Sequence, residues 1–305
     1  MQRKVIGAMF AVVLLGAFAL AQAQQALEDY LDVLTVQVKP DKRAEFDAIN
    51  KKMAVANRQN KGDSWIAMET IYGRGNRVTF VSSRHGYTDV ETAMGVFDHA
   101  MEKALGKAAA EKLEQDFYQC IDSSRSEIRR RRWDLSSNAP SDPAAYAKMI
   151  AESRWLRTVT VHVKPGQIAT FEALAKDVKM ARDKSPSPAV LVSQAVAGQD
   201  GTVFYVTTLE NSLAGFDSLP TNQQLLGDEA YQRFLKTNAE AVSGTETAIN
   251  RFLPELSNAP EQVVAVAPDY WRPKSTAVAA KTNAAKTAAV NAAETTKMDE
   301  KDKKH

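Results

Sequence analysis

Six polar side chains could together form a binding site, and they occur as three pairs with nearly constant spacing. The pairs are Gln37 with His162, Glu69 with Gln194, and Arg130 with Arg251. Members of the first two pairs are 125 residues apart, and those of the third are 121 apart. Imidazole, carboxylate, amide and guanidinium groups around one cavity could orient a small polar or aromatic ligand. Histidine side chains ordinarily titrate near neutral pH, so His162 is one candidate for moving a proton, and Glu69 is the other.

The histidines can also have a purely structural role. A lone histidine on a strand, such as His162, is more often structural when no second catalytic group follows at a fixed spacing. Neither His85 nor His99 belongs to a metal-binding pattern such as His-Glu-x-x-His, and Cys120 is the single cysteine. We therefore expect no metal site, and no internal disulfide can form.

The paired spacing arises because the chain contains one unit twice. The segment LTVQVKP at 34–40 returns as VTVHVKP at 159–165, and the offset of 125 then holds without a gap into VTFVSS at 78–83 and VFYVTT at 203–208. Both copies end alike, on WDLSSNAP at 133–140 and PELSNAP at 254–260, where the offset is 121. The second copy is thus four residues shorter. A period this long is not a solenoid repeat, so it predicts two whole units fused in tandem.

Each unit reads as strand, helix, strand, strand, helices, strand, from alternating or helical apolar spacing. In the first unit we predict strand 33–39, helix 41–57, hairpin strands 65–72 and 77–84, two helices within 90–120 and strand 126–133. In the second we predict strand 158–164, helix 167–182, hairpin strands 189–197 and 203–209, helix to about 241 and strand 245–253. This order is that of a ferredoxin-like split βαβ unit, an antiparallel sheet with helices on one face.

Short motifs in both copies add a family resemblance. Lys39-Pro-Asp-x-x-x-x-Phe-Asp47, its echo Lys164-Pro-Gly-x-x-x-x-Phe-Glu172, and a last strand followed by Pro-Glu-Leu-Ser resemble the dimeric α/β-barrel superfamily. Within it the chain is most similar to antibiotic-biosynthesis-monooxygenase and NIPSNAP-like domains. The resemblance implies an α+β fold in which two tandem ferredoxin-like units form a pseudo-dimeric α/β barrel. The family usually makes its barrel from two chains, whereas here one chain supplies both halves.

A barrel of this kind would enclose one cavity, which is the default ligand site. On the first strand of each unit, valines at 36, 38, 161 and 163 should pack beneath helices, which turns Thr35, Gln37, Thr160 and His162 inward. In the alternative, the polar side chains satisfy one another across a filled barrel. Such a barrel would be packed shut by Trp65, Phe80, Phe204 and Tyr205.

We expect no bound cofactor. Haem-degrading relatives in the superfamily use an asparagine, a tryptophan and a histidine around the porphyrin. Asn57, Trp65 and His85 are of these types, but no motif supports giving them those roles. The run Arg129–Arg132 is predicted to be a charge cluster at the rim of the sheet, because alternate residues of a strand face opposite ways.

The ends of the chain predict export. Residues 1–23 have a basic start, an apolar run and the Ala21-Gln-Ala23 cleavage pattern of a signal peptide, so no membrane span should remain after cleavage. We expect a periplasmic or secreted protein with units at 27–140 and 154–262, a linker at 141–153 holding a short helix, and a disordered Ala/Lys-rich tail at 268–305. Without Arg3 and Lys4 the chain carries 37 basic and 37 acidic residues, which argues against a nucleic-acid partner.

Three functions follow from these predictions. The first is an exported module that binds a small ligand or has a structural role, as a monomer with an internal pseudo-dimer or as a homodimer. The second is a cofactor-independent monooxygenase-like or isomerase-like enzyme that uses the same cavity. The third is an envelope protein-interaction module that uses its outer surface or tail. An open pocket favours the first two, and a barrel packed shut favours a purely structural role.

Overall fold

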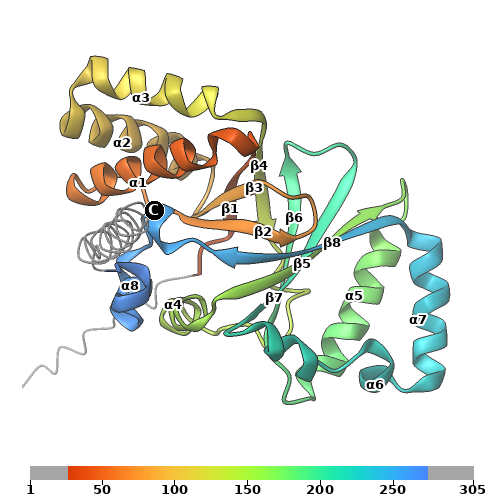
Figure 1. The fold of residues 1–305 in the computed structure, drawn as a ribbon. Coiled ribbons are helices and arrows are strands. Elements are labelled where there is room, and N and C mark those ends of the chain that lie inside the picture. The colour runs from red at the N-terminus through yellow and green to blue at the C-terminus, as the bar shows by residue number, and fades with distance from the viewer. Residues whose placement is uncertain (1–26, 274–305) are drawn as a thin grey trace, which may run out of the picture.

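The fold is α+β and is built around one sheet of eight strands (Figure 1). The computed structural model describes residues 27–273, so the predicted signal peptide and the tail beyond Pro273 lie outside the described residues. The first unit consists of β1 (Tyr30–Val38), α1 (Arg43–Gln59), β2 (Ile66–Tyr72), β3 (Arg77–Arg84), α2 (Tyr87–Leu105), α3 (Lys107–Gln119) and β4 (Ile121–Arg131). The second consists of β5 (Trp155–Val163), α5 (Ile168–Asp183), β6 (Val190–Ala197), β7 (Thr202–Glu210), α6 (Asn222–Leu226), α7 (Asp228–Ala241) and β8 (Val242–Phe252). Helix α4 (Pro143–Glu152) joins them, and α8 (Glu261–Val266) and α9 (Pro268–Trp271) follow.

The eight strands close into a barrel in the order β1-β3-β2-β8-β5-β7-β6-β4. Each half is a four-stranded antiparallel sheet, and the halves meet at two antiparallel seams, β2 with β8 and β4 with β6. This is the predicted architecture of a dimeric α/β barrel, with both halves supplied by one chain. Within residues 27–273, no helix is long and apolar enough to cross a lipid bilayer.

The last strand of each unit begins earlier than predicted, by five residues for β4 and by three for β8. The added residues are 121–125 and 242–244, and all of them except Ile121 and Val242 are exposed and lack a large apolar side chain. Apolar alternation is therefore missing there. Pairing with β1 and β5, which the sequence does not display, extends both strands.

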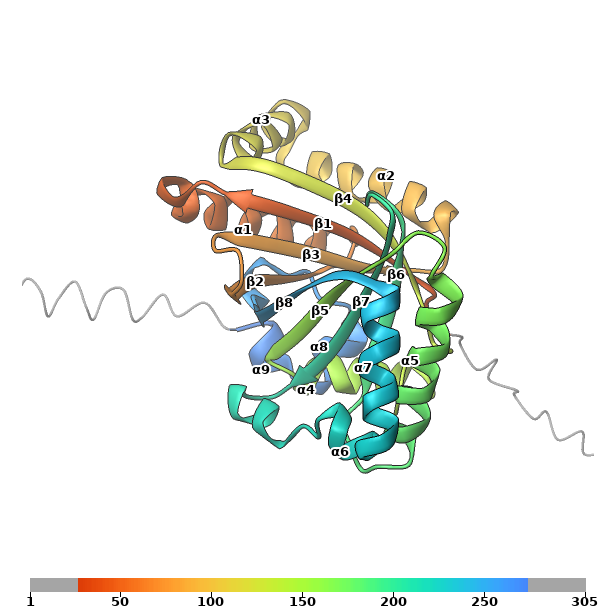
Figure 2. The same cartoon turned by 90° about the vertical axis from the view of Figure 1, so that its right-hand side faces the viewer.

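Helices cover the outside of the barrel and make two separate apolar cores. Figures 1 and 2 show α1, α2 and α3 on one half and α5 and α7 on the other. The motif phenylalanines lie at the centre of these cores. Phe46 packs against Phe117 with ring centroids 5.5 Å apart, and Phe171 against Phe204 at 4.6 Å. Phe80 also belongs to a helix-side core. The prediction that Phe80 and Phe204 could fill the barrel is therefore wrong.

A one-residue shift in the second hairpin explains the position of Phe204. In the first unit Thr35 pairs with Thr79, but in the second Thr160, the mate of Thr35, pairs with Tyr205. The structural mate of Thr79 is thus Tyr205 and not Phe204, which the gapless alignment had matched to it. Because side chains alternate along a strand, a shift of one residue exchanges the faces. Phe204 therefore faces the helices and Tyr205 faces the interior of the barrel.

One end of the barrel is covered by the linker helix and the last described segment. Helix α4 packs on α8, and a third apolar core at this end includes Ile150, Leu156, Phe252, Val263 and Trp271. The prediction of disorder from residue 268 is wrong for residues 268–271, because they form α9 and the Trp271 side chain is completely buried. The large apolar surface of Tyr270 and Trp271 supplies the burial that the remaining tail composition lacks.

We predict that Trp271→Ala lowers the free energy of unfolding by about 3–5 kcal/mol, because it opens a cavity between α4 and Phe252. Urea denaturation followed by far-ultraviolet circular dichroism measures this change. Val266→Ala is the control, since Val266 lies on α8 and is 43% exposed, and it should change stability by less than about 0.5 kcal/mol. Equal stability of wild type and Trp271→Ala would contradict the role given to α9.

Candidate functional site

The interior of the barrel is a cavity of about 770 Å³ lined from all eight strands. The lining follows the inward alternation of each strand, for example Thr158, Thr160 and His162 on β5. Residues from both ends of the strands contribute, so the cavity runs along the barrel. Helix α4 contributes Tyr146 and Ile150 at the covered end. A volume of this size suits a small organic molecule.

Two of the predicted site residues lie in the cavity lining. Gln37 and His162 occupy equivalent positions near the ends of β1 and β5, and Gln37 is paired with Arg77 of β3. Thr35 and Thr160 line the cavity one inward position deeper, while Val36, Val38, Val161 and Val163 pack in the helix-side cores. Orientation on the first strands was thus predictable. Ligand contact by Gln37 and His162 stays a prediction.

The other four predicted residues lie outside the cavity lining, which corrects their assignment. On β2 it is Met68 and Thr70 that face inward, on β4 Arg129 and Arg131, and on β8 Asn250 and Phe252. The residues between them therefore face outward; these are Glu69, Arg130 and Arg251, and Gln194 does the same on β6 beside the inward Ser193. The assumption that polar residues face the cavity failed because each outward group has a partner or solvent on the helix side.

Glu69 is held by two arginines across the β2–β8 seam. It accepts hydrogen bonds from Arg43 of α1, at 2.8 Å, and from Arg251 of β8. Burial acts to raise the pKa of Glu69, but the two guanidinium groups outweigh it and hold the pKa below its usual range. At the opposite seam Arg132 donates to Gln194 at 3.0 Å and to Glu172 of α5. These residues connect the two halves across the seams.

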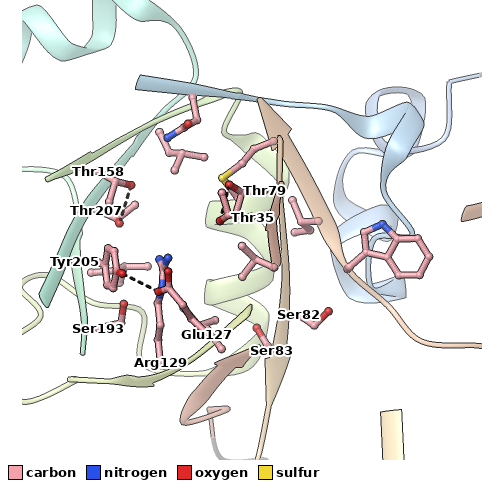
Figure 3. Close-up of a pocket in the computed structure, with 18 of the residues that line it drawn as sticks. Thr35, Thr79, Ser82, Ser83, Glu127, Arg129, Thr158, Ser193, Tyr205 and Thr207 are labelled. Atoms are coloured by element: carbon pink, nitrogen blue, oxygen red, sulfur yellow. Dashed lines mark hydrogen bonds and ion pairs between the residues drawn. The ribbon is translucent and has the colours of Figure 1, made fainter. Parts of the chain in front are cut away.

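A charged cluster that the sequence did not reveal lies inside the barrel (Figure 3). Glu127 of β4 is 4% exposed and accepts hydrogen bonds from Arg129 Nε at 2.8 Å, Tyr205 Oη at 2.7 Å and Gln199 Nε2 at 2.7 Å. The Arg129 guanidinium also lies over the Tyr205 ring, 3.5 Å from its centroid. The carboxylate thus accepts three hydrogen bonds, from β4, from β7 and from the turn that precedes β7.

Tyr205 is kept as a neutral phenol by this environment. Burial raises the pKa of Tyr205 far above its usual range; the Arg129 charge acts in the opposite direction, and the bond to Glu127 adds to the rise. The phenol is therefore protonated at any physiological pH. It serves as a hydrogen-bond donor.

Two pairs of threonines furnish hydroxyl groups on the remaining walls. Thr35 and Thr79 are hydrogen-bonded at 3.2 Å, and Thr158 and Thr207 at 3.1 Å (Figure 3).

The alternation of Arg129–Arg132 indicated that some of these arginines face inward, but the register shift at Tyr205 concealed their partner in the barrel. Of the three residue types that haem-degrading relatives use, Trp65 and His85 line the cavity. Asn57 does not, since it is buried on α1 and donates to Met53 O.

Arginine dominates the charge of the cavity lining. Among residues 27–273, five arginines and three glutamates line it, and neither a lysine nor an aspartate does. The uncovered end carries most of the exposed charge, whereas the end beneath α4 is lined by apolar side chains, among them Leu31, Leu156, Leu191, Leu209 and Phe252. The cavity is therefore amphipathic along its length and has an excess of positive charge.

Comparison with known proteins gives structural similarities alone. No protein-family model matches the chain, and no curated protein matches it. Similar solved structures include an anthrone oxidase-like protein, with 12% identity, 74% of this chain and 92% of that chain covered, and a TM-score of 0.48. They also include a heme-binding protein from Thermus thermophilus (10%, 75% and 93%, 0.42) and chlorite dismutase from Candidatus Nitrospira defluvii (10%, 79% and 96%, 0.43). Similarity of this size does not transfer an activity or a ligand.

We predict that Glu69→Gln lowers the free energy of unfolding at pH 7 by about 1–3 kcal/mol, because two charge-assisted hydrogen bonds weaken. The pKa of Glu69 is lower in the folded protein than its ordinary 4.5. The stabilising contribution is therefore complete above that pH and is lost as the pH falls through the folded value. Urea denaturation at pH 7, 5, 4 and 3 should show the two proteins converging in acid.

Glu111→Gln is the matched control, since Glu111 is exposed on α3 and forms no ion pair among the described residues. It should follow the wild type at every pH. A difference between wild type and Glu69→Gln that stays constant from pH 7 to pH 3 would show that the loss of stability does not depend on the negative charge of Glu69.

Proposed function

We propose that this protein binds a small organic ligand inside its barrel. The single observation that carries the proposal is the cavity of about 770 Å³, which a structural barrel would have filled with side chains. Its polar groups are already fixed by hydrogen bonds, as at Glu127, so they are preorganised to orient a guest. The sequence resemblance to antibiotic-biosynthesis-monooxygenase and NIPSNAP-like domains supports a small molecule as the partner.

The distribution of lining residues supports an amphipathic ligand. Threonine hydroxyls and the Glu127–Arg129 pair offer donors and acceptors at mid-barrel, and leucines line the end beneath α4. A molecule with a polar or anionic group and an apolar body would satisfy both regions. A fully apolar guest would leave the polar wall unpaired, which costs free energy.

Binding is better supported than proton-transfer catalysis at the charged cluster. Glu127 accepts three hydrogen bonds, and the raised pKa of Tyr205 disfavours a phenolate. Neither group is a ready general base. His162, near the uncovered end, remains the group through which an isomerase-like or monooxygenase-like reaction would be tested.

Export and a monomeric state complete the proposal. The basic start, apolar run and cleavage pattern of residues 1–23 support a periplasmic or secreted location. A single chain supplies all eight strands, so a second chain is not needed to form the barrel.

The test is native mass spectrometry of protein purified from its own host. We expect a retained small molecule in the wild type and its loss in Ala248→Trp, because the indole would occupy the cavity. Thr247→Trp is the matched control, since Thr247 is the exposed neighbour on the other face of β8. Its ligand should stay bound. Wild type that carries no molecule, or a molecule that Ala248→Trp retains in full, would contradict binding within the barrel.

A further inference from the structure

Arg131 is a buried arginine that lines the cavity without an acidic partner. Arg131 is 7% exposed and lies at the end of β4, beneath helix α4. Among residues 27–273 no carboxylate forms an ion pair with it, and its Nε is buried without a hydrogen-bond acceptor. A buried charge normally has a counter-ion, because desolvation of a lone charge is costly.

The neighbours of Arg131 leave part of the guanidinium unused. Nη2 donates to Ser83 Oγ at 3.0 Å and to Tyr146 Oη at 2.6 Å. The guanidinium carbon lies 4.6 Å from the Tyr146 ring centroid and 5.3 Å from that of Trp133. All these partners are neutral. They hold the guanidinium in place, and they do not neutralise its charge.

Two other arginines are as deeply buried and show the contrast. Arg84, the last residue of β3, is 5% exposed and forms ion pairs with Asp63 at 2.6 Å and Asp32 at 3.6 Å. Arg182 on α5 also forms no ion pair among the described residues, but it lies outside the cavity lining, and its Nε donates to Ser137 Oγ at 3.2 Å. Arg131 alone among the three faces the cavity, and it is the one for which a ligand could supply the missing charge.

We infer that Arg131 anchors the carboxylate of an amphipathic ligand at the covered end of the cavity, an inference that rests on the proposed function. A planar carboxylate matches the guanidinium in charge and geometry. The hydroxyls of Ser83 and Tyr146 lie within reach of the same carboxylate. Leu31, Leu191 and Ile150, which line the cavity at this end, would contact the apolar body of the ligand.

Isothermal titration calorimetry at pH 7 with 2-naphthoate and the neutral 2-naphthamide tests the anchor. Wild type should bind naphthoate at least about tenfold more tightly, since a hydrogen bond between charged groups is worth that much. In Arg131→Gln this preference should fall to about twofold or less, with naphthamide affinity nearly unchanged. Equal affinity of wild type for both probes, or a preference that survives Arg131→Gln, would overturn the inference while leaving the cavity a binding site.

A different outcome would count against the proposed function itself. If wild type binds neither naphthoate nor naphthamide and carries no molecule in native mass spectrometry, the cavity is not a binding site. The assignment of Arg131 falls with it.

Thermal stability of the ligand-free protein gives a second, independent readout. Arg131→Met removes a buried charge that lacks a counter-ion, so its melting temperature should equal that of wild type within about 2 °C or exceed it. Arg84→Met is the matched control and should melt at least roughly 5 °C lower, because it leaves Asp63 and Asp32 unpaired. A loss in Arg131→Met as large as that in Arg84→Met would make Arg131 a structural residue and overturn the inference.

Discussion

Closure of two half-barrels on each other is the constraint on which this structure depends. A four-stranded sheet with helices on one face leaves its other face bare and both of its edge strands unpaired. Here β2 pairs with β8 and β4 pairs with β6, so no strand of the sheet remains an edge. Ion pairs mark both seams, around Glu69 at one and around Arg132 at the other. The cavity exists because these seams close.

The packed cores and the unfilled cavity are separate regions of this fold. The large apolar cores lie between the sheet and its helices, where Phe46 and Phe171 are buried. The interior of the barrel adds hydrogen bonds and hydroxyl pairs, but side chains do not fill it as they fill a protein core. Because the cores outside hold each half together, the interior is free to keep unfilled volume and a buried charge. Proteins commonly keep such locally unfavourable features where they function.

Most of the fold could be predicted from the sequence, and about half of the site could not. The duplication, the order of elements and the inward direction of Gln37 and His162 follow from strand alternation next to a clear helix-side valine pattern. On β2 and β8 the assumption that polar side chains face the cavity was wrong, because Glu69 and Arg251 pair with each other on the helix side of the sheet. At Tyr205 a single inserted residue reversed the face. Pairing partners and register are long-range properties, and no local pattern reports them.

The fusion of the two halves has a consequence for how a guest would lie. Structural mates run in the same direction around the barrel, so the pseudo-twofold axis follows the channel. In a true homodimer, a molecule on such an axis has two equivalent poses related by rotation. Here the mates differ: Glu127 lies opposite Ala248, and Arg131 opposite Phe252. Because these mates differ, the two poses would not be equivalent, and one wall of the barrel is the polar one.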